Sequence, residues 1–319
     1  MNNKGIALVI TLLVLTLLLT IILEFGMDMR VEARSAANFR DEMKAYYLAK
    51  SGVTFAITVL EKDSIEDNNE GTRYDSLNED WAKKLPPVPV GDGTVSVEIT
   101  DEDSKINLNK LPNKVPDKLR SLATGQNMRA LMSRFLKQFD VNESLTDEIP
   151  DSIADFIDED SDELPNGAES SYYEGLEEHY SAKNKPLDSL QELRMIKGID
   201  GDLFSKLNKF LTVNSDPLIN VNTASREVLL SLFEDSIGSK DVVDEIIATR
   251  TEHPFQKTSD LQEHILDNLV YTNISKFIDV KSNFFSIKST GEVNNSRKTI
   301  TASVQRQGNK GTILYWRIE

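Results

Sequence analysis

An unbroken apolar run near the N-terminus is the strongest hydrophobic pattern in the chain. Residues 6–23 contain no charged side chain and follow a short polar head in which Lys4 is the one charge. At a helical rise of roughly 1.5 Å per residue, this run is about 27 Å long and can cross the hydrocarbon core of a bilayer. Glu24–Met27 supplies no small-residue cleavage site, so the run predicts a retained single-pass anchor rather than a cleaved secretory signal. The position of Lys4 predicts a cytoplasmic N-terminus and a non-cytoplasmic bulk.

Apolar and charged residues alternate with helical spacing after the anchor, so we expect one stem helix over residues 6–61. Ala45, Ala49 and Gly52 lie on this stem and are small enough to let another surface approach closely. We therefore expect them to be assembly contacts with a neighbouring protein. An amphipathic helix packed on its own domain is the alternative interpretation, and the two are compatible.

Strand patterns flank a long helical block. Residues 94–99 alternate in polarity, and residues 105–108 look like a second strand after a turn. The C-terminal residues 284–293 and 298–305 predict a hairpin, followed by a last strand over 312–318. The fold class we expect is therefore α+β, with a large helical domain inserted between the strands of an antiparallel sheet. The expected divisions are a leader (1–5), the anchor and stem helix (6–61), the first part of the sheet domain (62–111), the helical insertion (112–280) and the second part of the sheet domain (281–319).

The charge balance restricts the class of partner. Among 319 residues, 52 acidic and 36 basic side chains give a formal net charge of -16, which argues against nucleic acid or anionic lipid as the main partner. Residues 140–178 hold fifteen Asp or Glu and no Lys or Arg. The chain has no cysteine, which excludes disulfides, thiolate catalysis and cysteine-based zinc sites and is compatible with a periplasmic location.

The acidic segment contains a candidate metal-binding loop. Carboxylates at 158, 160 and 162, with Glu169 eleven residues after the first, match positions 1, 3, 5 and 12 of the EF-hand loop. Position 6 is Glu163 instead of glycine, and Pro165 interrupts the pattern, so a calcium loop that is not a true EF-hand fits better. A solvated acidic loop is the alternative. We expect one or two structural Ca²⁺ ions held by Asp155, Asp158, Asp160, Asp162 and Glu169.

No catalytic pattern is present in the sequence. His179, His253 and His264 lack the spacing of paired ligands, and no phosphate-binding loop or nucleophile motif occurs, so we expect no enzymatic activity. Residues 193–211 look like a helix-hairpin-helix, a module that often holds DNA phosphates, but Asp200 in its turn would repel a phosphate. A scaffold role is favoured for it. The repeated pattern INxN at 106–109 and 219–222 predicts asparagines that hold turns and cap helices.

Several motifs together resemble one family over nearly the full length of the chain. They are Lys4-Gly5 before the anchor, Ile10 in the anchor, YYLAKSG (46–52), DSKINLN (103–109), DFIDEDSDELPNGAESSYY (155–173), LDSLQELRMIKGID (187–200) and INVNTASREVLLSL (219–232). The set resembles the minor pseudopilin called protein K of the type II secretion system, or general secretion pathway protein K. Residue for residue, the resemblance implies cleavage by prepilin peptidase after Gly5 and a methylated Ile6. It also implies calcium in the acidic loop.

The resemblance further implies a pilin-like fold and a place at the tip of the pseudopilus. Most such subunits carry a glutamate at the fifth mature position, where this chain has Ile10. The implied partners are the minor pseudopilins I and J, the major pseudopilin, prepilin peptidase and the inner-membrane assembly platform, in the cell inner membrane with the bulk in the periplasm. A membrane-anchored DNA-binding protein of the competence type and a minor pilin of a type IV pilus are the alternatives.

Overall fold

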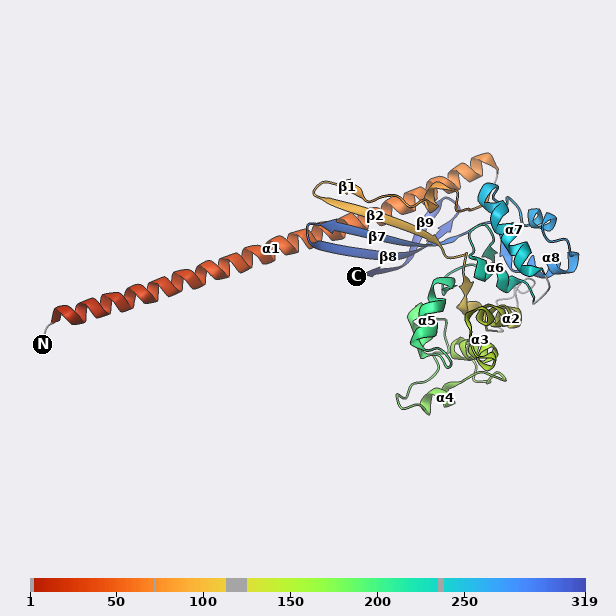
Figure 1. The fold of residues 1–319 in the computed structure, drawn as a ribbon, viewed down its shortest axis with the longest axis horizontal. Helices are drawn as coiled ribbons and strands as arrows, with labels where there is room; N and C mark the ends of the chain where they lie inside the picture. The colour runs from red at the N-terminus through yellow and green to blue at the C-terminus, as the bar shows by residue number, and fades with distance from the viewer. Residues whose placement is uncertain (1–2, 72, 113–124, 235–237) are drawn as a thin grey trace.

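The computed structural model describes residues 3–71, 73–112, 125–234 and 238–319. It confirms the α+β class, with a long N-terminal helix, an antiparallel sheet and a helical insertion (Figure 1). The helices are α1 (Asn3–Glu70), α2 (Gly125–Leu136), α3 (Glu143–Ile157), α4 (Ser170–Glu174), α5 (Gly201–Leu207), α6 (Arg226–Leu232), α7 (Ser239–Glu252) and α8 (Asn268–Ile274). The 3-10 helices are η1 (Asp80–Ala82), η2 (Leu108–Lys110), η3 (Lys137–Phe139), η4 (Leu190–Met195), η5 (Asn208–Phe210) and η6 (Thr258–Glu263). The strands are β1 (Val88–Val90), β2 (Gly93–Asp101), β3 (Ile106–Asn107), β4 (Leu211–Thr212), β5 (Ile219–Asn220), β6 (Ile278–Asp279), β7 (Phe284–Val293), β8 (Ser296–Gln307) and β9 (Lys310–Ile318).

Helix α1 extends beyond the predicted end of the stem. It continues to Glu70, whereas the sequence pattern predicted that the stem helix ends at residue 61. Asp63 is held on the helix by an ion pair with Arg306 at 2.8 Å, and the Ser64 hydroxyl donates to the Gly308 carbonyl at 2.9 Å. The helix stops before Gly71, whose φ of 72° is open to glycine without a steric cost. Tertiary partners therefore keep a polar segment helical.

The five-stranded sheet has the order β1-β2-β7-β8-β9, and all of its pairs are antiparallel. Strands β7 and β8 form the predicted hairpin, with the turn at Asn294 and Asn295 and a positive φ of 52° at Asn294. One face of the sheet packs on the C-terminal part of α1. The buried cluster between them includes Val53, Leu60, Trp81, Phe285, Ile287, Ile300 and Val304.

The small residues of the stem face the chain's own sheet, as the alternative interpretation of a helix packed on its own domain predicted. Ala45 and Ala49 are fully buried. A Cβ on Gly291 of β7 would lie 2.1 Å from the Ala45 carbonyl oxygen, and a Cβ on Gly52 would lie 2.1 Å from Ser289 Oγ. Glycines on both surfaces thus bring helix and sheet close together, and this packing occupies the stem face that we had assigned to assembly.

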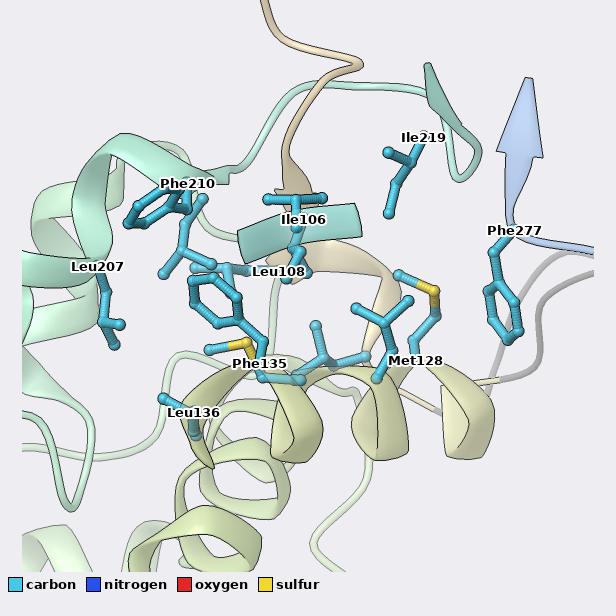
Figure 2. Close-up of a cluster of buried hydrophobic side chains, with 14 of the residues drawn as sticks. Ile106, Leu108, Met128, Phe135, Leu136, Leu207, Phe210, Ile219 and Phe277 are labelled. Carbon is cyan, nitrogen blue, oxygen red and sulfur yellow. The ribbon is translucent and has the colours of Figure 1, made fainter. Parts of the chain in front are cut away.

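The helical insertion has a hydrophobic core of its own. Ile106 and Leu108 point into it beside Phe135 of α2 and Phe210 of η5 (Figure 2). Strand β3 pairs in parallel with β4, with Ile106 opposite Leu211, and not with the large sheet. Residues 106–111, which the sequence analysis assigned to the sheet domain, therefore belong to the insertion. Of the residues assigned to the insertion, 113–124 and 235–237 lie outside the described residues.

The repeated INxN pattern (106–109 and 219–222) forms two similar turns inside the insertion. Asn107 Oδ1 accepts from the Asn109 amide at 3.0 Å, and Asn220 Oδ1 accepts from the Asn222 amide at 2.9 Å, which confirms the turn-holding role. The last asparagine of each motif then binds a distant backbone segment. Asn109 exchanges two hydrogen bonds with Leu187, and Asn222 exchanges two with Phe255. The two asparagine motifs therefore make matching contacts.

Candidate functional site

The acidic loop lies between the end of α3 and α4. Asp155 is in the last turn of α3 and is fully buried, and its carboxylate accepts from the Leu164 amide at 3.1 Å. Gly167 packs against that carboxylate so closely that a Cβ there would lie 1.8 Å from Asp155 Oδ2. The loop therefore folds back over a buried carboxylate on the helix end. Burial of an ionised carboxylate is costly unless a cation or several donors compensate it.

Buried oxygens without a hydrogen-bond partner occur in this loop and in the segment that follows α4. They include Oε1 of Glu169, a residue that is 4% exposed, and Oδ1 of Asn184. The second Glu169 oxygen accepts from the Ser170 amide at 3.2 Å, and the Asn184 side-chain amide donates to the Asp160 carbonyl at 3.4 Å. Buried oxygens that have no donor are the groups that a hard cation would satisfy.

The remaining predicted ligands lie within electrostatic reach of this position. Asp158 caps the end of α3, and the Asp160 carboxylate accepts from the Asp162 amide at 3.1 Å. Burial, and then the charges of Asp160, Glu163 and Asp162, raise the pKa of Glu169. The structure thus gathers the predicted ligands around one loop, with Asp162 on its exposed side.

Asn184 is a candidate ligand that the sequence analysis missed. It lies fifteen residues beyond Glu169 and has a φ of 49°. Its backbone amide donates to the Phe156 carbonyl at 3.0 Å. An amide oxygen is a usual calcium ligand beside carboxylates. The sequence offers no signal for it, because the contact is made by a loop that returns to α3. Asp155, Asp158, Asp160, Glu169 and Asn184 together fit a structural Ca²⁺ ion by the chemistry of their donors.

A tighter group of carboxylates elsewhere is already engaged by a cation. Among the described residues, one oxygen each from Asp63, Asp75 and Glu79 lie within 4.8 Å of one another. The guanidinium of Arg306 binds both aspartates. Glu79 accepts from the Trp81 indole at 2.6 Å and from the Ser76 amide. These groups are therefore compensated by the protein itself, in contrast with the loop.

The calcium-free loop is expected to respond to pH in a definite direction. Burial, together with the charges of Glu169 and Asp158, raises the pKa of Asp155 to about 7. The unfolded carboxyl titrates near pH 4, so between about pH 4 and 7 the folded state binds a proton that the unfolded state releases. Stability of the calcium-free chain should therefore rise as pH falls from 7.5 to 5.5.

The contribution of Asp155 can be isolated with one variant. Asp155→Asn removes the titrating group, so its gain in melting temperature between pH 7.5 and 5.5 should be smaller than that of the wild type. Excess calcium should also reduce the wild-type gain, since the ion favours the ionised carboxylate. Equal gains for both proteins in chelator would contradict a titrating carboxyl at this position.

The apolar end of α1 is unpartnered within the chain. One helix of the described residues is long and apolar enough to cross a membrane, and its most apolar window has no buried residue. Ile6 is 52% exposed and Ile10 is 56% exposed. Gly5 belongs to the helix, which starts at Asn3. The described helix therefore carries the predicted anchor on an apolar surface that lacks protein cover.

Asp200 in the helix-hairpin-helix segment has a structural role as a helix cap. Gly198 has a φ of 85°, and Asp200 caps the N-terminus of α5 by accepting from the Leu203 amide at 2.7 Å. This carboxylate occupies the helix end where a phosphate would bind in a nucleic-acid complex. The geometry agrees with the scaffold role and disfavours the DNA-binding alternative.

Comparison with known proteins gives one consistent result. Residues 104–216 and 219–275 match family models described as type II secretion system (T2SS), protein K. The chain is 26% identical to the type II secretion system protein K of Aeromonas hydrophila, with 97% of this chain and 95% of that protein covered. It is 28% identical to the protein K of Pseudomonas aeruginosa, with 97% and 90% covered.

A solved structure has the same fold. It is the GspK-GspI-GspJ complex of the enterotoxigenic Escherichia coli type 2 secretion system, which is matched with a TM-score of 0.72 and 22% identity, over 90% of this chain and 99% of that one. At this identity the likeness speaks for the fold. The two matched segments together span more than half of the 319 residues, and both carry the same description. The chain therefore belongs to the protein K family of the type II secretion system.

Proposed function

We propose that this minor pseudopilin begins or caps the pseudopilus at its tip. The observation that carries the proposal is Ile10 on the exposed face of the anchor, where most pilin-like subunits have a glutamate. Such a glutamate neutralises the N-terminal amine of a neighbour, and one half of a buried ion pair is costly to leave alone. A subunit with Ile10 offers no carboxylate to a subunit ahead of it. Its own Ile6 amine can still meet the glutamate of the subunit below.

The shape of the chain supports an end position. The insertion projects sideways from the far end of α1, beyond the sheet (Figure 1). A body of that size would be hard to place within a closely packed helical filament. The role that we propose is structural and without catalysis. The implied contacts are with minor pseudopilins I and J and with the major pseudopilin below.

Association of full-length proteins tests this proposal. The chain, co-expressed with minor pseudopilins I and J and extracted in detergent, should co-purify with both as one complex. Deleting its gene should reduce secretion while the major pseudopilin is still made. Normal secretion and pseudopilus length in the deletion strain, together with no co-purification, would contradict the tip position. Recovery with type IV pilus subunits instead would favour the minor-pilin alternative.

We also propose that the chain is processed and anchored as a pseudopilin. Prepilin peptidase would cut after Gly5 on the cytoplasmic side and leave a methylated Ile6, with residues beyond the anchor in the periplasm. The support is the position of Gly5 directly before the apolar run. Replacing Gly5 with leucine should leave the leader attached, which mass spectrometry of the intact protein would detect.

A second glycine of the same helix provides the matched control. At Gly26 no neighbouring atom lies within 4 Å of the position that a Cβ would take. Gly26→Ala should therefore leave cleavage unchanged. A wild-type protein that retains Met1, or that is cut near Phe25, would contradict the proposed processing.

The proposed calcium ion would lock the loop after α3 in one shape. Hard oxygen donors without histidine or cysteine favour calcium over zinc, and flexible carboxylates suit its six to eight ligands. The proposed ligands are Asp155, Asp158, Asp160, Asp162 and Glu169, joined by Asn184. The unsatisfied oxygens of Glu169 and Asn184 support this assignment.

A further inference from the structure

Among the described residues, the insertion and the stem-and-sheet unit do not share a buried hydrophobic cluster. The buried apolar residues fall into two separate clusters, one within the insertion and one between α1 and the sheet. Two chain crossings connect the units, from β2 to β3 and from β6 to β7. Such a junction can act as a hinge unless other contacts hold it. Tyr74 packs against the core of the insertion, the Asn78 side chain donates to the Thr251 carbonyl at 3.0 Å, and a network of polar groups at the crossings joins the two units.

Arg306 of β8 binds three segments at this junction. Its side chain is 7% exposed, and its guanidinium donates to Asp63 on α1 at 2.8 Å, to the Ser282 carbonyl at 2.8 Å and to the Asp75 carboxylate. The Arg306 amide also donates to the Asn283 carbonyl at 2.6 Å. Arg306 thus joins the stem to the second crossing and to the segment that follows α1. Its planar fork makes several directed hydrogen bonds at once, which a lysine could not reproduce.

Asn220 of β5 approaches the same groups from the insertion. It is fully buried, and its side-chain amide lies 2.8 Å from Ser282 Oγ, 3.0 Å from the Asp75 carbonyl and 3.3 Å from Asp101 Oδ2. Asp75 and Ser282 are therefore held by Arg306 on one side and by Asn220 on the other. Asp101 ends β2, so the first crossing is tied into the same network.

Further contacts complete the link at each crossing. The Thr223 hydroxyl of the insertion donates to Asp101. Asp103 accepts from the Asp216 amide at 2.6 Å on the insertion and from the Phe284 amide at 2.9 Å at the start of β7. Burial raises the pKa of Asp75, and the charge of Arg306 opposes that rise. Loss of the guanidinium would leave this buried carboxylate without its countercharge.

We infer that Arg306 is a positioning residue that, through Asp75 and Ser282, fixes the direction in which the helical insertion projects from the stem. The inference rests on the proposed function only in its biological consequence, since a tip subunit must present insertion and stem together to its partners. The orientation itself is a property of the isolated chain.

Distances between spin labels measure this orientation directly. The chain has no cysteine, so Thr58→Cys on α1 and Ala248→Cys on α7 place two labels at exposed positions, one in each unit. In the full-length protein in detergent, the wild-type background should give one narrow distance peak. Arg306→Gln should widen and shift the distribution, with loss of the wild-type peak.

Two further variants make the result decisive. Arg226→Gln makes the same substitution inside the insertion, where it removes an exposed bidentate ion pair with Asp244, and should leave the narrow peak unchanged. Asn220→Ala cuts the network from the insertion side and should widen the distribution even if Arg306→Gln fails to fold. A wild-type peak in folded Arg306→Gln, or in Asn220→Ala, would overturn the inference.

Co-purification with minor pseudopilins I and J separates this inference from the proposed function. If Arg306 only positions the insertion, Arg306→Gln should lose both the narrow peak and part of the complex. If Arg306→Gln widens the peak but the wild-type chain does not co-purify with minor pseudopilins I and J, the proposed function is contradicted and the positioning role is still supported.

Discussion

Replacing Gly291 with valine is expected to destabilise the stem-and-sheet unit by on the order of 3 kcal/mol, because the added side chain enters well-packed space. A Cβ at this position would lie 2.1 Å from the Ala45 carbonyl oxygen and 2.7 Å from the Ala49 amide nitrogen. Both are backbone atoms of α1, so no side-chain rotation can relieve the overlap. Helix and sheet would have to separate and expose the cluster around Phe285 and Ile287. Thermal or denaturant unfolding of the full chain in detergent measures the loss.

A glycine in open space provides the control for this substitution. Gly201 is the first residue of α5. Beyond its own stretch of helix, no atom lies within 4 Å of the position that a Cβ would take, and its φ is outside the left-handed region. Gly201→Ala should change stability by less than about 1 kcal/mol, and in the stabilising direction. If Gly291→Val unfolds like the wild type, α1 does not pack on β7 as closely as described.

Removing one carboxylate from the acidic loop is expected to abolish stabilisation by calcium. An ion that binds the folded state alone raises the free energy of unfolding by about 2.7 kcal/mol at a hundredfold excess over its dissociation constant. Glu169→Gln keeps the size of the side chain but removes the negative charge of the carboxylate, whose Oε1 is buried without a hydrogen-bond partner. The wild-type melting temperature should rise with added calcium, while that of the variant should not.

The matched control removes an equal charge from the same acidic segment. Glu177 is exposed and lies outside the proposed ligand set, so Glu177→Gln should keep the full response to calcium. Circular dichroism should show that the long helix persists in both variants. An unchanged wild-type melting temperature between excess chelator and millimolar calcium would contradict the site.

Local patterns in the sequence predicted the elements that depend on neighbouring residues. The apolar run at 6–23 indicated the anchor, and the alternation at 284–293 and 298–305 indicated a hairpin that the structure confirms. The carboxylate spacing around Asp158 led to the loop where buried oxygens without partners occur. In each case the signal lies within a few residues of the feature that it predicts, so periodicity and spacing were sufficient.

Contacts between distant segments were beyond the reach of such patterns. The sequence suggested that Ala45 and Ala49 are close-packing residues, but not that their partner is Gly291, about 240 residues later in the same chain. Residues 105–108 were predicted to be a strand of the sheet domain. Their partner β4 lies in the insertion instead, so Ile106 and Leu108 belong to its core. A small or apolar side chain shows that something packs against it without identifying the partner.

The sequence by itself determined the anchor, the fold class, the acidic loop and the family resemblance, since these follow from composition, period and motif. Only the tertiary structure decided which surface the stem residues cover, that Asn184 joins the acidic loop and that Arg306 joins stem and insertion. The physical reason is that buried polar groups must find partners wherever the folded chain brings them together. Arg306 and Asp75 are separated by 231 residues, and no local pattern records their contact.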